Sequence, residues 1–157
     1  MAWDEYFDSA AQGRRPTSDF EWYAADRKGQ LAFLTSAGFG LVPMLVFQSK
    51  EAYYRAKSFF RSLPIRCGHV LYANGPYNWS SWIKAAEQGL YGYDWNAPAG
   101  QYVPGYPYKA IASPESPLTL PDLPADLQSW VSLICFDVEF DTARELSPEL
   151  AFAEVNL

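Results

Sequence analysis

The sequence predicts an α+β domain, with an antiparallel sheet of about five to seven strands and two main helices packed on one face. Hydrophobic residues make up 49% of the 157-residue chain, which provides enough apolar surface for one core. Short apolar runs between glycine and proline turn signals indicate strands, and two longer stretches with helical apolar spacing indicate helices. The length suits a single domain over residues 1–157.

The first predicted elements are an arm and a hairpin. Residues 1–18 are polar and predict an N-terminal arm or short helix. The apolar runs 19–25 and 30–36 flank a polar link that ends at Gly29, which is typical of a bulged β-hairpin.

The first main helix is expected over residues 49–63, which carry apolar side chains at helical spacing. Ser49 is its predicted N-cap, and Pro64 ends it. Its outer face bears the one basic patch of the sequence, which consists of Arg55, Lys57 and Arg61, with Arg66 just beyond. We expect this patch to be a solvated helix face.

The second main helix is expected to begin at a cap formed by Asn78 or Ser80. It carries one apolar stripe from Trp79 to Leu90, and Gly89 closes it.

Further strands are expected at residues 66–73, 91–95 and 106–111. Residues 112–125 contain four prolines and predict an extended, Pro-rich connector.

Residues 131–141 have the clearest strand pattern in the chain, because apolar and polar side chains alternate there. The apolar set is Ile134, Phe136, Val138 and Phe140, and the other set is Cys135, Asp137, Glu139 and Asp141. Period 2 places the apolar set on the core and a ladder of three carboxylates on one exposed face, about 7 Å apart per step.

Charge is distributed unevenly and excludes some ligand classes. Residues 1–109 hold 11 Lys and Arg against 9 Asp and Glu, whereas residues 110–157 hold one Arg against 9 acids. The resulting net charge of −6 disfavours nucleic acid as a ligand and permits a basic protein partner.

Location and cofactors follow from what the sequence lacks. No apolar run approaches the ~18 residues of a membrane span, and the acidic start does not have the pattern of a Sec signal. We therefore expect a cytoplasmic protein with no membrane contact. Two cysteines and one histidine do not make a zinc site, so we expect no metal and no cofactor.

One candidate catalytic pair is Cys67 and His69, which share a face of a predicted strand. Same-face Cβ atoms on one strand stand ~6–7 Å apart, which is too far for a direct thiol–imidazole bond. We expect a core cysteine and a hydrogen-bonded histidine, and no catalytic residues.

The candidate binding residues are three carboxylates and two aromatic side chains: Asp137, Glu139, Asp141, Tyr93 and Trp95. The carboxylates need positive compensation, which can come from Lys or Arg on a neighbouring strand, from Ca²⁺ or from a basic partner. The aromatic residues precede a loop rich in proline and glycine, a usual place for binding residues.

Two stretches resemble a known group of proteins. Residues 19–26 running into 31–38, and residues 91–95 together with Pro107 and Tyr108, resemble small uncharacterised bacterial single-domain proteins, some of which look like immunity proteins of polymorphic toxin systems. The resemblance implies an inhibitor that presents acids to a basic partner.

We therefore expect a non-enzymatic binding protein, of the immunity type, that inhibits a basic protein partner. Two alternatives stay open. One is a small-molecule or carbohydrate-binding domain, or a weak hydrolase, that uses the Trp/Tyr cluster between Tyr72 and Tyr108. The other is a structural homodimer with this aromatic patch as its interface.

Overall fold

The computed structural model of the chain describes residues 7–8, 19–97 and 101–147. The described helices are α2 (Lys50–Arg61), α3 (Ser80–Glu87) and α4 (Ala125–Val131), with short 3₁₀ helices η1 (Met44–Phe47) and η2 (Leu120–Asp122). The described strands are β1 (Glu21–Ala25), β2 (Leu31–Thr35), β3 (His69–Leu71), β4 (Tyr91–Asp94), β5 (Tyr108–Pro114) and β6 (Glu145–Leu146). The predicted arm at residues 1–18 lies outside the described residues, apart from Phe7 and Asp8, which are helical.

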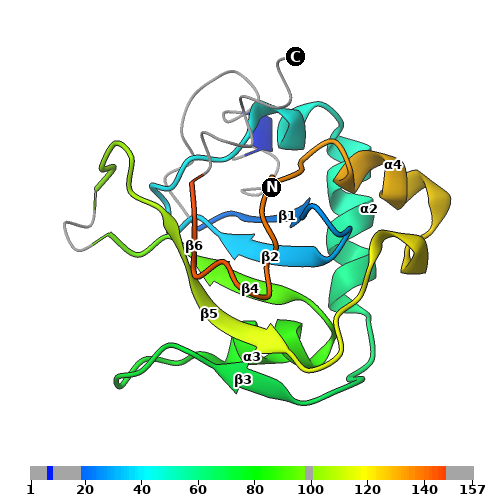
Figure 1. The fold of residues 1–157 in the computed structure, drawn as a ribbon. Helices are drawn as coiled ribbons and strands as arrows, with labels where there is room; N and C mark the ends of the chain where they lie inside the picture. The colour runs from blue at the N-terminus through cyan, green and yellow to red at the C-terminus, as the bar shows by residue number, and fades with distance from the viewer. Residues whose placement is uncertain (1–6, 9–18, 98–100, 148–157) are drawn as a thin grey trace.

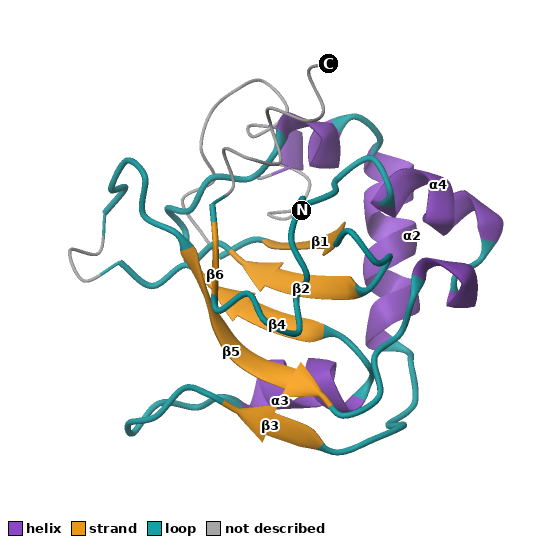
Figure 2. Ribbon diagram, viewed as in Figure 1, coloured by secondary structure: helices purple, strands orange, loops and turns teal. Residues whose placement is uncertain are grey.

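The six strands form one mixed sheet in the order β1-β2-β4-β5-β3, and β6 pairs with β5 (Figures 1 and 2). The α+β class is confirmed, but the prediction of a purely antiparallel sheet is wrong, because β2 and β4 are parallel. Parallel neighbours need a long crossover, and here α2, β3 and α3 lie in the chain between β2 and β4.

The predicted hairpin is confirmed as β1 and β2, which pair antiparallel from Glu21–Thr35 to Ala25–Leu31. Gly29 adopts a φ of 78° in the turn, a conformation that side chains with a Cβ rarely take. Gly29 was therefore a correct signal for the hairpin in the sequence, because the turn requires this backbone conformation.

The first predicted helix is confirmed as α2, and its predicted cap is also confirmed. The Ser49 hydroxyl accepts a hydrogen bond from the Ala52 N–H at 3.1 Å. The inner side of α2 packs on β1, where Phe60 stacks on Tyr23 with 4.5 Å between the ring centroids.

Helix α3 approaches the sheet closely at β4. A Cβ at Gly92 would lie 3.2 Å from the Cβ of Trp82, so a residue without a side chain allows this approach. Gly92 pairs with Phe33 of β2, which pairs with Tyr23 of β1. The three residues therefore share one face of the sheet.

Residues 131–141 do not form the predicted strand. Val131 is the last residue of α4, and residues 132–141 are irregular apart from one parallel bridge, in which Cys135 pairs with Ala25. The apolar residues Ile134, Phe136 and Phe140 are nevertheless buried. The alternation of apolar and polar residues therefore reflects which side chains are buried against the sheet, and the segment does not form the hydrogen bonds of a strand.

The predicted connector at 112–125 also differs from the structure. Strand β5 continues through Pro114, and the remaining residues contain η2 before α4 begins at Ala125. Proline is compatible with these places, because Pro114 ends a strand and Pro121 lies at the start of a helical turn.

The segment between α4 and β6 crosses the sheet and is drawn in orange to red in Figure 1. It packs on the face that carries Trp22 and Tyr93, through ring contacts from Phe136 and Phe140. Tyr93 fastens it further, since its hydroxyl donates to the carbonyl of Ala143 at 2.7 Å.

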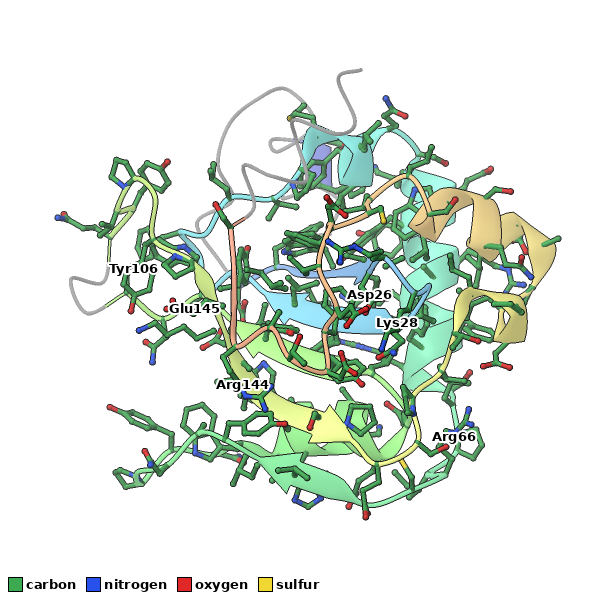
Figure 3. The ribbon with its side chains drawn as sticks, in the orientation of Figure 1. Asp26, Lys28, Arg66, Tyr106, Arg144 and Glu145 are labelled. Atoms are coloured by element: carbon green, nitrogen blue, oxygen red, sulfur yellow. The ribbon has the colours of Figure 1, made fainter. Side chains whose placement is uncertain are left out.

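Asp26, which is only 2% exposed, joins the hairpin turn to this segment. Its Oδ1 accepts the N–H groups of Lys28 at 2.9 Å and Gln30 at 2.8 Å, and its Oδ2 accepts the N–H of Phe140 at 2.8 Å. Asp26 and Lys28 lie together beside the segment in Figure 3. A carboxylate suits this place because both of its oxygens are acceptors.

We expect Asp26→Asn to lower the free energy of unfolding by about 1–3 kcal/mol, because an amide nitrogen cannot accept one of these backbone N–H groups. Urea unfolding at neutral pH measures the change. The control is Asp137→Asn, the same substitution at an exposed ion pair, which should cost less than about 1 kcal/mol. Equal losses for the two variants would contradict the role given to Asp26.

Candidate functional site

The three predicted carboxylates lie beside the hairpin turn. Asp137 Oδ1 is 2.9 Å from Arg27 Nε, while Lys28 Nζ is 3.3 Å from Asp141 Oδ2 and 3.7 Å from Glu139 Oε2. The sequence left open whether this compensating charge comes from the chain itself, from Ca²⁺ or from a basic partner. In the structure, Arg27 and Lys28 of the same chain supply positive charge.

The two predicted aromatic binding residues are buried. Tyr93 lies beneath the segment that carries the carboxylates and is 1% exposed. Trp95 donates from Nε1 to the carbonyl of Tyr106 at 2.9 Å and is 2% exposed. Both side chains hold the core and a loop together and do not present a surface next to the acids.

The proposed Trp/Tyr cluster is also mainly part of the core. Tyr91 and Tyr108 are buried, whereas Tyr77 is well exposed. The pKa of Tyr91 is raised to about 12, and burial is the largest of several causes of this increase. Of this cluster, Trp82 lines one of the two cavities described below.

Cys67 and His69 have separate partners. The Cys67 thiol lies 3.5 Å from the carbonyl oxygen of Ala86. His69 Nδ1 shares a 3.1 Å hydrogen bond with Glu87 Oε2, as expected for a hydrogen-bonded histidine. Neither contact joins the thiol to the imidazole, so the geometry does not activate Cys67.

A cleft lies between α2 and α3, over β1 and β2. It consists of two cavities, of about 300 Å³ and about 230 Å³, which share Glu21, Phe33, Arg61 and Ser81 as lining residues. The larger cavity is also lined by Tyr23, Phe60, Lys84, Ala85, Gln88 and Leu90, and the smaller by Asp19, Thr35, Lys57 and Trp82.

A row of polar side chains crosses three strands next to the cleft; Glu21 and Thr35 line the smaller cavity, and Asp94 lies beyond them in the row. Glu21 of β1 pairs with Thr35 of β2, and Thr35 pairs with Asp94 of β4. Thr35 and Asp94 are the last residues of two parallel strands, so both carboxyl ends meet here. Ligand sites in sheets with parallel strands form at such ends.

Hydrogen bonds connect Trp82, Thr35 and Asp94. The indole Nε1 of Trp82 donates to Thr35 Oγ1 at 3.1 Å, and the Thr35 hydroxyl donates to Asp94 Oδ1 at 2.6 Å. These two hydrogen bonds fix the orientation of the Trp82 side chain, which α3 places at the wall of the cleft.

Asp94 is buried at 8% exposure, and this burial raises its pKa from the ordinary 3.8 to about 6. The hydrogen bond from Thr35 opposes the shift but does not cancel it. Asp94 is thus a carboxyl group that changes its charge near neutral pH.

Glu21 is held by two cations of α2. Arg61 Nη2 lies 2.8 Å from Glu21 Oε1, and Lys57 Nζ lies 3.5 Å from the same oxygen. Both are ion pairs without good hydrogen-bond geometry, since Oε1 has no hydrogen-bonded partner. Burial lowers the pKa of Lys57, and the charge of Glu21 opposes this effect.

The cleft can bind a small molecule between charged, polar and aromatic side chains. Within residues 7–8, 19–97 and 101–147, no three His, Cys, Asp or Glu side chains are grouped as a metal site would require. None of the helices in the described part of the chain has the length and apolar character needed to cross a membrane.

Sequence reasoning missed Glu21 and Thr35 as site residues, and it did not connect them with Trp82 of the aromatic cluster or with Asp94. Their proximity depends on the parallel pairing of β2 with β4, which no local pattern encodes. One signal was present: Asp94 is a carboxylate inside an otherwise aromatic strand, where charge is costly unless it has a role.

Comparison of the chain with protein-family models, with curated proteins and with solved structures finds no match.

We expect Asp94→Asn to change the pH dependence of stability. The folded protein binds the Asp94 proton more tightly than the unfolded chain, so the unfolding free energy of the wild type falls as pH rises from about 4 to about 6. The variant lacks this loss, so its stability relative to the wild type should rise by about 2–3 kcal/mol between pH 4 and pH 7.

Urea unfolding at a series of pH values measures this difference, and carbon-13 NMR of the carboxyl group reports the titration of Asp94 directly. Parallel stability profiles, or a carboxyl titration near the ordinary value of 3.8, would contradict the assignment.

Proposed function

We propose that the chain is a non-enzymatic binding protein whose ligand is a small molecule held in the cleft. In this proposal α2 and α3 pack on one face of the sheet and form the two walls of the cleft. The observation that carries the proposal is the cleft itself, whose lining combines Glu21 with Lys57 and Arg61 and adds the hydroxyl groups of Thr35 and Ser81.

Burial of ionisable groups costs folding free energy, and proteins concentrate such groups at functional sites. Asp94 and Lys57 are both buried, and burial shifts the pKa of each toward its neutral form. Lys57 of α2 lines the smaller cavity, and Asp94 of β4 accepts a hydrogen bond from Thr35, which lines the same cavity. A purely structural interface would use apolar side chains there at lower cost.

Binding is favoured over catalysis because the polar groups at the floor already have protein partners. Thr35 is engaged by both Trp82 and Asp94, and Glu21 is shared by two cations. Groups held in this way are fixed for recognition, whereas a nucleophile needs an adjacent free base.

Blocking the cleft tests this function. We expect small-fragment binding, followed by amide chemical-shift changes in α3, to be lost in Ser81→Trp, because the indole would fill the space between the helices. The matched control is Ser80→Trp, at the preceding exposed position, which lines neither cavity. Fragment binding that survives Ser81→Trp would contradict the proposal.

A second candidate function is an immunity-type inhibitor of a basic protein. The observation that favours it is incomplete charge compensation. Among the described residues, the three carboxylates form ion pairs with two cations, Arg27 and Lys28, and the side chain of Asp137 is 69% exposed. A partner rich in lysine and arginine could add to this cluster, which combines accessible acids with a rigid support.

For this candidate, we expect Asp137→Asn with Asp141→Asn to weaken capture of a basic partner from a lysate of the source organism at low salt, because the attraction is electrostatic. The control is Glu51→Gln with Glu115→Gln, which removes the same charge at exposed positions elsewhere. Equal capture by both double variants would rule out this surface.

A further inference from the structure

The larger cavity of the cleft carries more positive than negative charge. Arg61 of α2 and Lys84 of α3 line it from opposite helices, and Glu21 is the one carboxylate among its described lining residues. Glu21 is also paired with Lys57, which lines the smaller cavity, so its charge is compensated by two cations of α2.

Lys84 differs from most cations of the described chain. The following six have carboxylate partners within 4 Å: Arg27, Lys28, Lys50, Arg55, Lys57 and Arg61. Lys84 has no ion pair among the described residues, although it lies on a cavity wall and the chain has a net charge of −6. Its charge is therefore available to a ligand.

Lys84 also has a hydroxyl neighbour on the same wall. Ser81 and Lys84 are three residues apart on α3, a spacing that places them on one side of a helix, and both line the larger cavity. An ammonium, a guanidinium and a hydroxyl all donate hydrogen bonds, so this end of the cleft is rich in donors.

Apart from Gln88, the remaining lining residues of this cavity are mainly aromatic and aliphatic. Tyr23, Phe33 and Phe60 contribute aromatic rings, and Leu90 adds an aliphatic surface. A volume of about 300 Å³ lies at the lower end of the range for small-molecule sites. The ligand therefore needs a small apolar body in addition to its polar group.

We infer that the ligand of the cleft is a small organic anion, with a carboxylate or phosphate group held by Arg61, Lys84 and Ser81 and an apolar body on Phe33 and Phe60. This inference rests on the proposed function, whose site it specifies. A cationic ligand fits less well, since Glu21 is already compensated twice and Asp19 Oδ1 accepts the Ala37 N–H at 2.9 Å.

The test uses probes of similar shape and different charge: benzoate, phenyl phosphate, benzyl alcohol and benzylamine. Titrations followed by amide shifts of Ser81, Lys84 and Ala85 should give saturable binding for the two anions, tighter than for the alcohol or the amine. Tighter binding of phenyl phosphate than benzoate would assign the anion as a phosphate, and the reverse order as a carboxylate.

Lys84→Met should weaken benzoate binding about tenfold, because it removes one charge-assisted contact from an exposed position and leaves the apolar walls in place. Lys109→Met is the matched control, since Lys109 lies over the ring of Tyr106 and lines neither cavity. The affinity of this control should equal that of the wild type.

The outcomes separate the two proposals. Preferential binding of benzylamine or benzyl alcohol that is lost in Ser81→Trp would overturn the anionic assignment and leave the cleft as a binding site. Benzoate binding that is unchanged in Lys84→Met would also overturn the anionic assignment. Absence of binding by all four probes would overturn both the assignment and the proposed function.

Discussion

The carboxylate of Asp26 is the interaction on which the rest of the structure depends. It gathers three backbone N–H groups, two from the hairpin turn and one from Phe140, more than a hundred residues later in the chain. Buried donors without acceptors cost more than the net gain of a typical hydrogen bond, so one side chain fixes both segments. Once Phe140 is fixed, the segment that carries it covers the face of Trp22 and Tyr93.

Closing one face of the sheet determines where a ligand can enter. The opposite face carries Glu21, Thr35 and Asp94, and the cleft opens there. Asp26 and Asp94 show two uses of a buried carboxyl group. Asp26 is bound by three N–H donors, whereas hydrogen bonds from Thr35 and from the Trp95 backbone do not offset the burial of Asp94, so its pKa stays raised. The first arrangement stabilises the fold, and the second leaves a carboxyl group whose charge responds to pH.

Local signals predicted local elements well. Gly29 identified the hairpin, and Ser49 identified the start of α2. The site could not be predicted in the same way, because it depends on pairing between strands that are distant in sequence. At residues 131–141 the period-2 pattern described burial correctly, but a strand also needs a continuous partner edge, and β1 offers only Ala25. The helical pattern likewise predicted that the basic face of α2 is solvated. In the structure Lys57 and Arg61 pair with Glu21 of β1, a contact between two elements that the pattern of one helix cannot predict.

The net charge of −6 does not oppose an anionic ligand, because electrostatics in salt is local. At physiological ionic strength the Debye length is about 8 Å, so exposed acids beyond that distance contribute little to the potential in the cleft. The charges within reach of a ligand are Arg61 and Lys84 on the walls and Glu21 between them. The side chain of Arg61 is 62% exposed, so salt weakens the attraction of the cleft for an anion as well as the attraction of the acidic surface for a basic partner. Salt does not screen the apolar contacts on Phe33 and Phe60, so these contacts contribute a larger share of ligand binding as the salt concentration rises.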